Sequence, residues 1–312
     1  MNKEKQENTK VLCFKVDVDT ERGTRIGVPN LVNLFKDMEI PATFLFSLGP
    51  DNTGKAITRI FRPGFLKKVS RTSVVSTYGI RTLLNGVLLP APHIGKRHAE
   101  LLQNVKSSGF EVGIHSYDHY RWQDHVGKMK LAQISCEFAK ALAEFQRIFG
   151  CPGRAAGAPG WQANEKTLTV YDEANFLYGS DCRGSVPFFP KVGDKIFKTL
   201  QIPTTLPTLD ELLGLSEYPP EKITPHYLSL LKVSYPNIMT IHAELEGMKY
   251  LSWFKEFLQN LKQNNIEFKT LEMIAEKYLE QRNEINICEV IQGEVPNRSG
   301  KLAIQSTGVI SL

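Results

Sequence analysis

Short apolar runs alternate with amphipathic segments along most of the chain, and this alternation predicts its fold. Runs rich in β-branched and aromatic residues, each short enough for one strand, lie at 11–18, 42–48, 110–114, 154–157, 176–180, 195–202 and 238–241. Segments with helical spacing of apolar residues lie at 28–38, 99–107, 127–149, 164–174, 208–213, 225–232, 249–263 and 270–280. Such alternation predicts an α/β architecture with a largely parallel sheet, which would occupy residues 1–284. The weakly patterned segment 285–312 is expected to be an irregular tail packed on this domain.

Residues suited to acid–base or metal chemistry lie at or just after the carboxyl ends of predicted strands. They are Asp17, Asp19, His115, Asp181 and His242. In α/β barrels this end of the strands carries the active site, so we expect these side chains to converge.

Two histidines, His115 and His119, are spaced i, i+4. On a single helical turn both imidazoles would lie on one face and could reach one ion. One carboxylate of the Asp17 and Asp19 pair would supply a third ligand, and the other a proton acceptor. Two histidines and one carboxylate leave coordination positions open on a divalent metal, as hydrolysis requires. A surface H-x-x-x-H is more often incidental, but the aspartates and His242 favour a metal site.

Composition and cysteine usage narrow the class of protein. The 312 residues are 42% hydrophobic, which is ample for a core, and the net charge is +5. Five scattered cysteines without a C-x-x-C pair fit a reducing compartment rather than a disulfide framework. The N-terminal MNKEKQENTK lacks the apolar core of a secretory signal, and no run is long enough to span a bilayer. A cytoplasmic protein is expected, one that could still lie on a membrane surface, with no nucleic-acid partner.

A basic insertion at 50–97 is too long for an ordinary connection. No Asp or Glu occurs from 52 to 99. Bulky apolar residues there can share one face of a helix, with lysines and arginines on the other. This pattern is typical of an interfacial segment that enters an anionic bilayer surface. The residues expected to contact the membrane are Arg59, Phe61, Arg62, Phe65, Lys67, Lys68, Leu84 and Leu88. The alternative is a helical hairpin packed on the barrel, and both hold if one face packs while another is exposed.

Sequence blocks along nearly the whole chain resemble one family. They are VDVDTERGTRIGVP (16–29), FLFSLGPDN (44–52), GIHSYDHYRWQ (113–123), AAGAPGWQAN (155–164), YGSDCRG (178–184), QIPTTLPTLDE (201–211), TIHAELEG (240–247) and QGEVPNRSGKL (292–302). The two-histidine block resembles the polysaccharide deacetylase (NodB-homology) superfamily, which implies a distorted seven-stranded (β/α) barrel. The SDCRG, QIPTTLPT and IHAELEG blocks and the insertion resemble a narrower group, the bacterial deformylases acting on 4-deoxy-4-formamido-L-arabinose-phosphoundecaprenol.

The resemblance implies a role for each matching residue. Asp19, His115 and His119 would bind one divalent ion, for which Zn, Mn, Co and Ni suit the ligands about equally. Asp17 would be the general base and His242 the general acid. Because Val18 separates two aspartates that are usually adjacent, base and ligand could also be exchanged.

Further roles follow from the same blocks. Asp181 would orient His242, and Arg183 would hold the carboxylate of Asp17. The third motif departs from the family pattern, because Pro159-Gly160-Trp161 follows Arg154 at a longer spacing, so which arginine pairs with the base stays open. Trp161, Tyr117 and Arg154 are candidate substrate-binding residues. The alternatives are a structural ion pair for Asp181 and Arg183, and core packing for the aromatic residues.

The implied substrate is a formamido sugar on a polyprenyl phosphate at the cytoplasmic side of the bacterial inner membrane. A divalent ion would polarise the formyl oxygen and lower the pKa of bound water, Asp17 would take the proton, and His242 would protonate the departing amine. The products, amino sugar and formate, belong to the pathway that adds aminoarabinose to lipid A and confers polymyxin resistance. Other enzymes of that pathway are candidate partners.

Two other functions compete with deformylation. One is an N-deacetylase of another glycan, which the missing signal sequence and the basic insertion disfavour. The other is a non-catalytic protein that binds polyprenyl glycolipids, which would be favoured if Asp17 or His242 were absent. Both residues are present.

Overall fold

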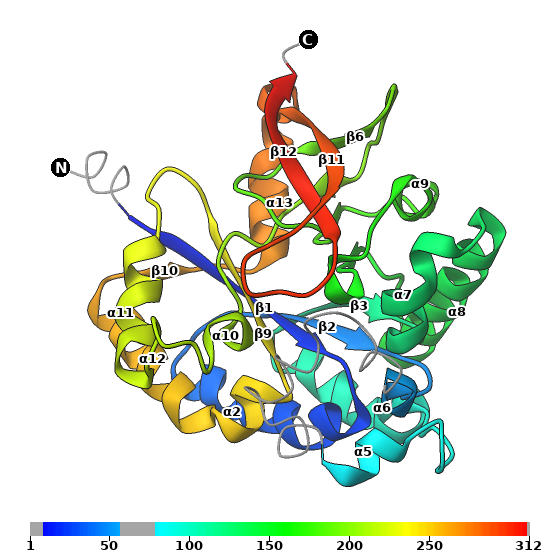
Figure 1. The fold of residues 1–312 in the computed structure, drawn as a ribbon, viewed down its shortest axis with the longest axis horizontal. Coiled ribbons are helices and arrows are strands. Elements are labelled where there is room, and N and C mark those ends of the chain that lie inside the picture. Colours follow the sequence, from blue (N-terminus) through cyan, green and yellow to red (C-terminus); the bar gives the residue numbers. More distant parts are fainter. Residues whose placement is uncertain (1–8, 57–78, 311–312) are drawn as a thin grey trace.

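A parallel sheet curved into a partial barrel forms the centre of the computed structural model, which describes residues 9–56 and 79–310 (Figure 1). Strand β1 pairs with β2, β9 and β10, and from β2 the order continues through β3, β4 and β5 to β8. The bounds are β1 Val11–Val18, β2 Thr43–Ser47, β3 Glu111–Ser116, β4 Ala155–Ala156, β5 Tyr178–Gly179, β8 Leu200–Gln201, β9 Asn237–His242 and β10 Glu267–Phe268. The predicted α/β class with a parallel sheet is confirmed.

The segment after β8 partly closes the barrel against β9. The backbone N–H groups of Thr205 and Leu206 donate to the carbonyl of Ile238 over 3.1 and 3.2 Å. Nearby, the hydroxyl oxygens of Thr204 and Thr240 lie 2.7 Å apart. Because these contacts replace a regular strand ladder, the barrel is distorted, as the family resemblance implied.

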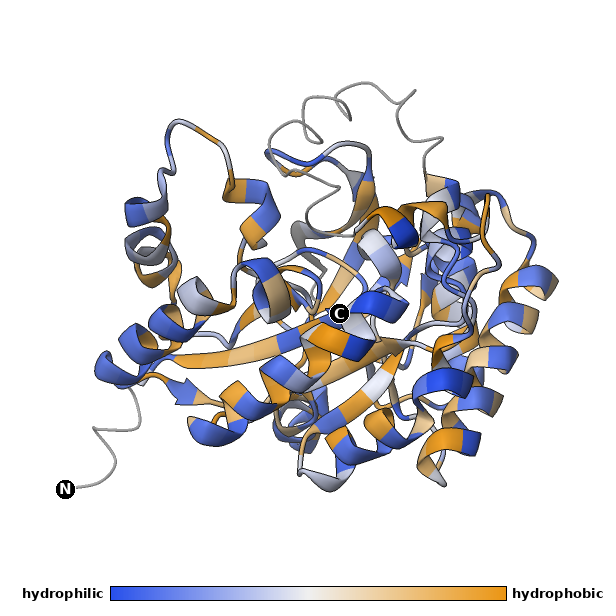
Figure 2. Cartoon of the chain, turned by 90° about the horizontal axis from the view of Figure 1, so that it is seen from below, coloured by the Kyte–Doolittle hydropathy of each residue, from blue (hydrophilic) through white to orange (hydrophobic). Residues whose placement is uncertain are grey.

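Helices cover the outside of the sheet and turn their apolar faces toward it. In Figure 2 the central strands are mainly hydrophobic, and polar residues lie on the outer sides of the helices. The helices are α2 Val28–Asp37, α5 Ile80–Leu84, α6 Ile94–Ser107, α7 His119–His125, α8 Leu131–Phe149, α9 Glu165–Glu173, α10 Leu209–Leu212, α11 Pro220–Leu230, α12 Leu251–Gln263 and α13 Leu271–Glu280. Within the described ranges no helix is both long and apolar enough to cross a bilayer.

Strand β1 divides its residues between the core and the barrel interior. Residues 12, 14, 16 and 18 are fully buried in the main core, where the ring of Phe14 lies 5.6 Å from Phe35 and 5.5 Å from Phe254. Because successive side chains point to opposite faces of a strand, Lys15 and Asp17 face inward instead. The interior of the barrel therefore receives charged groups directly before Asp19.

The expectation of an irregular tail at 285–312 was wrong. Strands β11 (Ile287–Gly293) and β12 (Leu302–Ile310) pair antiparallel, and β11 joins β6 (Phe189–Val192), which pairs with β7 (Lys195–Ile196). The predicted strand at 195–202 is thus two short strands, β7 and β8, in different sheets. The sequence signal is weak because β11 buries only two residues, Cys288 and Val290, and its partners are distant in the chain.

The predicted insertion is described only in part. Six of the residues expected to contact the membrane lie outside the described residues, namely Arg59, Phe61, Arg62, Phe65, Lys67 and Lys68. The described portion holds α5, a turn and the start of α6. Leu84 is half-buried there, whereas the side chain of Leu88 is 75% exposed.

A partly buried carboxyl at the amino edge of the sheet predicts a pH dependence of stability. Burial raises the pKa of Glu111 to about 7, although hydroxyls of Thr43 and Tyr178 and the N–H of Glu272 donate to it. Since the folded pKa lies above the unfolded value of about 4.5, the folded state keeps a proton that the unfolded chain loses. The contribution of Glu111 to the free energy of unfolding therefore falls as the pH rises from about 4.5 to 7.

Glu111→Gln should remove this fall. We expect the free energy of unfolding of wild type, relative to the variant, to drop by about 2–3 kcal/mol between pH 4.5 and pH 8. Urea unfolding at several pH values measures the difference, and contributions from other carboxyls cancel between the two proteins. Parallel stability curves would contradict a raised pKa at Glu111.

Candidate metal centre and active site

His115 and His119 come from two different elements that meet at one turn. His115 lies in β3, and His119 begins α7, whose N-cap Asp118 accepts a hydrogen bond from the N–H of Arg121. The prediction that both lie on a single helical turn was wrong, because the backbone of β3 remains paired with β2 through Ser116. The turn still brings the two imidazole centroids within 5.2 Å of each other.

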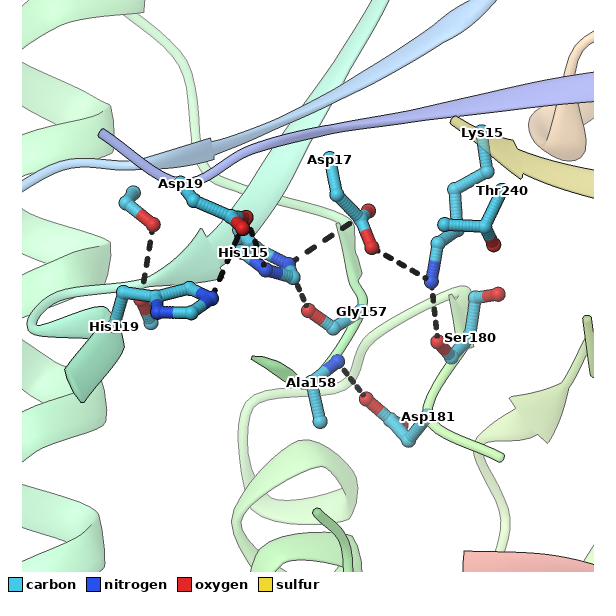
Figure 3. A network of polar contacts seen from close by, with 12 residues as sticks. Lys15, Asp17, Asp19, His115, His119, Gly157, Ala158, Ser180, Asp181 and Thr240 are labelled. Carbon is cyan, nitrogen blue, oxygen red and sulfur yellow. Dashed lines mark hydrogen bonds and ion pairs between the residues drawn. The ribbon is translucent and has the colours of Figure 1, made fainter. Parts of the chain in front are cut away.

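Asp19 completes a cluster with the two histidines (Figure 3). Its Oδ1 lies 3.2 Å from Nε2 of His115 and 3.4 Å from Nε2 of His119. One ligand atom from each residue lies within 4.8 Å of the other two. The cluster joins the residue after β1 to the end of β3 and the start of α7.

The chemistry of these atoms fits a divalent cation. Nδ1 of His115 lies 2.7 Å from the carbonyl of Gly157, which can only accept, so in the neutral ring the lone pair is on Nε2 and faces Asp19. Oδ1 of Asp19 is buried and accepts no hydrogen bond from any described residue. Burial alone would raise the pKa of Asp19, but the imidazoles of His119 and His115 hold that pKa well below its usual range. An oxygen of Asp19 and the Nε2 atoms of both histidines thus face one point.

Asp17 is held by Lys15 rather than by an arginine. Nζ of the fully buried Lys15 lies 3.4 Å from Oδ2 of Asp17 and donates to the carbonyl of Ser180 over 3.1 Å. The prediction that Arg183 holds Asp17 was wrong, because its guanidinium binds both carboxylate oxygens of Glu211 at 2.8 and 3.1 Å. The missed signal was the lysine two positions before Asp17 in an apolar run, which places both on one strand face.

The other oxygen of Asp17 points toward the metal cluster. Oδ1 lies 3.8 Å from Nδ1 of His115, and it is buried without a hydrogen bond from the part of the chain that the structure describes. Asp17 therefore offers an acceptor beside the three clustered ligands.

His242 lies across from Asp17 on the neighbouring strand. The two residues are partners in the parallel register of β1 and β9, and Nδ1 of His242 is buried with no hydrogen-bond partner in 9–56 or 79–310. The prediction that Asp181 orients this ring was wrong. Asp181 instead accepts from the N–H of Ala158, the hydroxyl of Tyr171 and the amide of Gln201. Burial raises the pKa of Asp181 to about 6.

Comparison with known proteins places this geometry in a family. A sequence model of the polysaccharide deacetylase family matches residues 4–179. The chain belongs to the polysaccharide deacetylase family. Two curated relatives are the probable 4-deoxy-4-formamido-L-arabinose-phosphoundecaprenol deformylases ArnD of Shewanella sediminis and of Wigglesworthia glossinidia brevipalpis. The first is 36% identical over 97% of this chain and 97% of its own length, and the second is 36% identical over 91% and 98%.

Solved structures support the same polysaccharide deacetylase fold. A putative polysaccharide deacetylase from Mycobacterium smegmatis covers 92% of this chain and 96% of its own, with a TM-score of 0.64 and 16% identity. PuuE allantoinase covers 88% and 91%, with a TM-score of 0.57 and 16% identity. At these identities the likeness concerns the fold alone.

Two buried glutamates of this polysaccharide deacetylase were not among the predicted site residues. Oε1 of Glu244 accepts from the backbone N–H groups of Asp19 and Thr20, while Oε2 of Glu246 accepts from the backbone N–H of His242. Burial raises the pKa of Glu244 to about 8, with the charge of Asp19 adding to the shift, and burial raises that of Glu246 to about 7. The signal was the pair of glutamates after the last strand in IHAELEG.

The three candidate substrate-binding residues lie in different places. Trp161 is buried beside the site, with Nζ of Lys15 5.5 Å from its ring centroid. Tyr117 is partly buried, and its hydroxyl lies 3.4 Å from Nε2 of His93. Arg154 was wrongly predicted, because it precedes β4 at the opposite edge of the sheet, where it pairs with Glu272 at 3.1 Å and lines a cavity of about 240 Å³.

Proposed function

We propose that this protein is a metal-dependent deformylase that hydrolyses the formamide of 4-deoxy-4-formamido-L-arabinose linked to undecaprenyl phosphate. The observation that carries the proposal is the convergence of Asp19, His115 and His119 next to Asp17 and His242. It is further supported by 36% identity to two curated deformylases over nearly the whole chain. The products are formate and the lipid-linked amino sugar.

The two aspartates have different roles in the proposed reaction. Asp19 is the metal ligand because its Oδ1 faces both imidazoles. Asp17 is the general base because its Oδ1 accepts no hydrogen bond from the described residues. Asp19, His115 and His119 would hold the cation, which when bound would supply Lewis-acid polarisation of the formyl oxygen and of an attacking water molecule. Lys15 fixes the second oxygen of Asp17, so the first stays directed toward the site where water loses its proton.

His242 supplies the proton for the departing amine. The register pairing of Asp17 with His242 on neighbouring strands supports this assignment of base and acid. Glu246 accepts a hydrogen bond from the backbone N–H of His242. This contact fixes the backbone at the end of β9 and so helps to position the imidazole of His242. Glu244 serves Asp19 in the same way by accepting from its backbone N–H at 3.2 Å.

The metal is one divalent ion, for which Zn, Mn, Co and Ni remain candidates. Two imidazoles and one carboxylate accept all four, so availability in the cell decides among them. Elemental analysis of protein purified without added metal identifies the ion that the site selects.

The described part of the insertion is proposed to rest on the cytoplasmic surface of the inner membrane, which makes the protein peripheral. Ile80, Val87, Leu88 and Leu89 expose 68, 55, 75 and 39% of their surface. The segment 80–89 is linked to the active site by hydrogen bonds. Oδ2 of Asp51 accepts from the side-chain amide of Asn85 and from the N–H of Glu21, which lies two residues after Asp19. If the segment 80–89 binds the membrane, it would therefore hold the metal centre at a fixed distance from the lipid carrier.

Replacing exposed apolar residues of the segment 80–89 with aspartate should release the protein from membranes. We expect Val87→Asp with Leu88→Asp to weaken binding to vesicles of phosphatidylglycerol and phosphatidylethanolamine by about tenfold or more, because two apolar side chains can no longer enter the bilayer. Vesicle co-sedimentation measures this. Ile196→Asp is the matched control, since Ile196 is 44% exposed on β7 in the second sheet. Equal binding of the double variant and the control would contradict the proposed contact.

Formate release tests the reaction itself. Metal-loaded protein with the lipid-linked formamido sugar should release one formate for each amino sugar formed, and the acetamido analogue should react far more slowly. Tight binding of the lipid without formate release would contradict the enzyme and support a glycolipid-binding protein. Faster release of acetate than of formate would identify an N-deacetylase instead.

A further inference from the structure

Three cationic side chains surround the ring of Trp161 next to the base. The guanidinium of Arg298 lies 4.4 Å and that of Arg183 5.1 Å from the ring centroid, with Nζ of Lys15 at 5.5 Å. Trp161 is only 2% exposed, and its Nε1 donates to Thr204. The ring thus connects the arginines to the lysine that holds Asp17.

The two arginines share a single carboxylate as their ion-pair partner among the described residues. Both contact Glu211, which is 1% exposed, Arg183 at 2.8 Å and Arg298 at 3.6 Å. Among the described residues, Glu211 is the one carboxylate within ion-pair distance of either guanidinium, and Lys15 is already paired with Asp17. Two nearly buried guanidiniums therefore share one ion-pair partner, and an anion that joined them would gain from both positive charges.

The two arginines are not equally free to bind such an anion. Arg183 is fixed by both oxygens of Glu211 and by the carbonyl of Leu206 at 3.0 Å. Arg298 has one longer contact to Glu211, and its remaining N–H donors make no hydrogen bond to the described residues. Arg298 is therefore the guanidinium able to donate to a ligand.

The C-terminal strands bring Arg298 to this position. It lies in the loop between β11 and β12, which descends from the second sheet toward β1 and β9 in Figure 1. The loop is tied down by the amide of Gln162, which donates to the carbonyl of Lys301 over 2.8 Å. In Figure 3, Lys15 lies on the opposite side of Asp17 from the metal cluster. The arginines therefore extend the site away from the cation.

We propose that Arg298, set on Trp161 beside Arg183, binds the phosphodiester that joins the sugar to its lipid carrier. This inference rests on the proposed function. The formamide and the phosphodiester are carried by one sugar ring, so when the formamide reaches the metal cluster, the phosphate lies about one ring away. A guanidinium donates two parallel hydrogen bonds to a phosphate, which combines charge and orientation. The C-terminal strands are then a specificity element for phosphate-linked sugars.

The test compares two soluble substrates that differ only in the phosphate. One is an ethyl phosphodiester of the formamido sugar, and the other is its ethyl glycoside. For Arg298→Ala we expect the KM of the phosphodiester to rise about 10–100-fold with kcat within about threefold, and the kinetics of the glycoside to be unchanged. Arg298→Lys should recover part of the loss. Arg282→Ala is the control, because Arg282 stacks 4.3 Å from Phe189 outside the site.

The possible outcomes separate this proposal from the function on which it rests. An equal loss on both substrates, or an unchanged KM for the phosphodiester, would overturn the role of Arg298. If wild type released no formate from either substrate, the proposed function would fail. Calorimetric binding of ethyl arabinosyl phosphate to metal-free protein then tests the phosphate site alone. At least tenfold weaker binding to Arg298→Ala, but not to Arg282→Ala, supports the site, and equal binding of all three proteins overturns it.

Discussion

Replacement of His115 with alanine is expected to remove the divalent ion and to reduce formate release to background. The change deletes one of three ligands and also the ring that Gly157 orients. Since loss of an outer partner of a metal ligand already costs about 10–100-fold in affinity, loss of the ligand itself should cost more. Metal content per chain, measured by plasma mass spectrometry after dialysis, and formate release under added metal record the two effects.

The matched control for this change is His125→Ala. His125 is exposed in α7, the helix that His119 begins, and its Nε2 lies 3.3 Å from the hydroxyl of Tyr120. This variant should keep one ion per chain and wild-type activity. An active, metal-loaded His115→Ala protein would mean that the ion lies elsewhere.

The second large effect is expected for Asp17→Asn. Asparagine keeps the shape of the side chain and a contact to Lys15, but it cannot take a proton from water. We expect kcat/KM to fall about 10²–10⁴-fold, the usual contribution of general acid–base catalysis, while one ion per chain remains bound. Steady-state formate release and metal analysis on the same sample measure both quantities.

Asp37→Asn is the control for Asp17, because Asp37 is exposed at the end of α2 and should leave the kinetics unchanged. Loss of the ion from Asp17→Asn would show that Asp17, not Asp19, is the ligand. Full activity would show that another group is the base.

Much of the fold could be predicted from local patterns. The run at 11–18 became β1 with the same bounds. Every residue from 12 to 18 is buried, and a short run that is mainly apolar is typical of a strand in a parallel sheet. The strand-end positions of Asp17, Asp19 and His115 were sufficient to expect convergence. The carboxyl ends of parallel strands lie at the same edge of the sheet, so the residues that follow the strands come close together there.

Side-chain partners were harder to predict than positions. Arg183 follows β5, as the sequence indicates, but nothing local reveals that its guanidinium turns to Glu211 in α10. Lys15 faces Asp17 because they share a strand face, and this could have been inferred from alternation alone. Asp181 was assigned to His242, yet its three donors come from Ala158, Tyr171 and Gln201, segments that only the folded chain brings together.

The C-terminal strands show the same limit at the level of secondary structure. In β11 exposed residues such as Ile291 alternate with buried Cys288 and Val290, so the run lacks the continuous apolar character of β1. Its stability comes from long-range pairing with β6 and β12, which local pattern does not encode. These strands also position Arg298, so the part of the chain that was predicted least well carries the proposed phosphate contact.

Anomalous diffraction from crystals grown with zinc or manganese tests the metal centre most directly. We predict one strong peak, about 2.0–2.2 Å from Nε2 of His115, Nε2 of His119 and an oxygen of Asp19, with the carboxylate of Asp17 free of the ion. A map with no peak between these three side chains, or with its peak at other residues, would contradict a metal-dependent hydrolase.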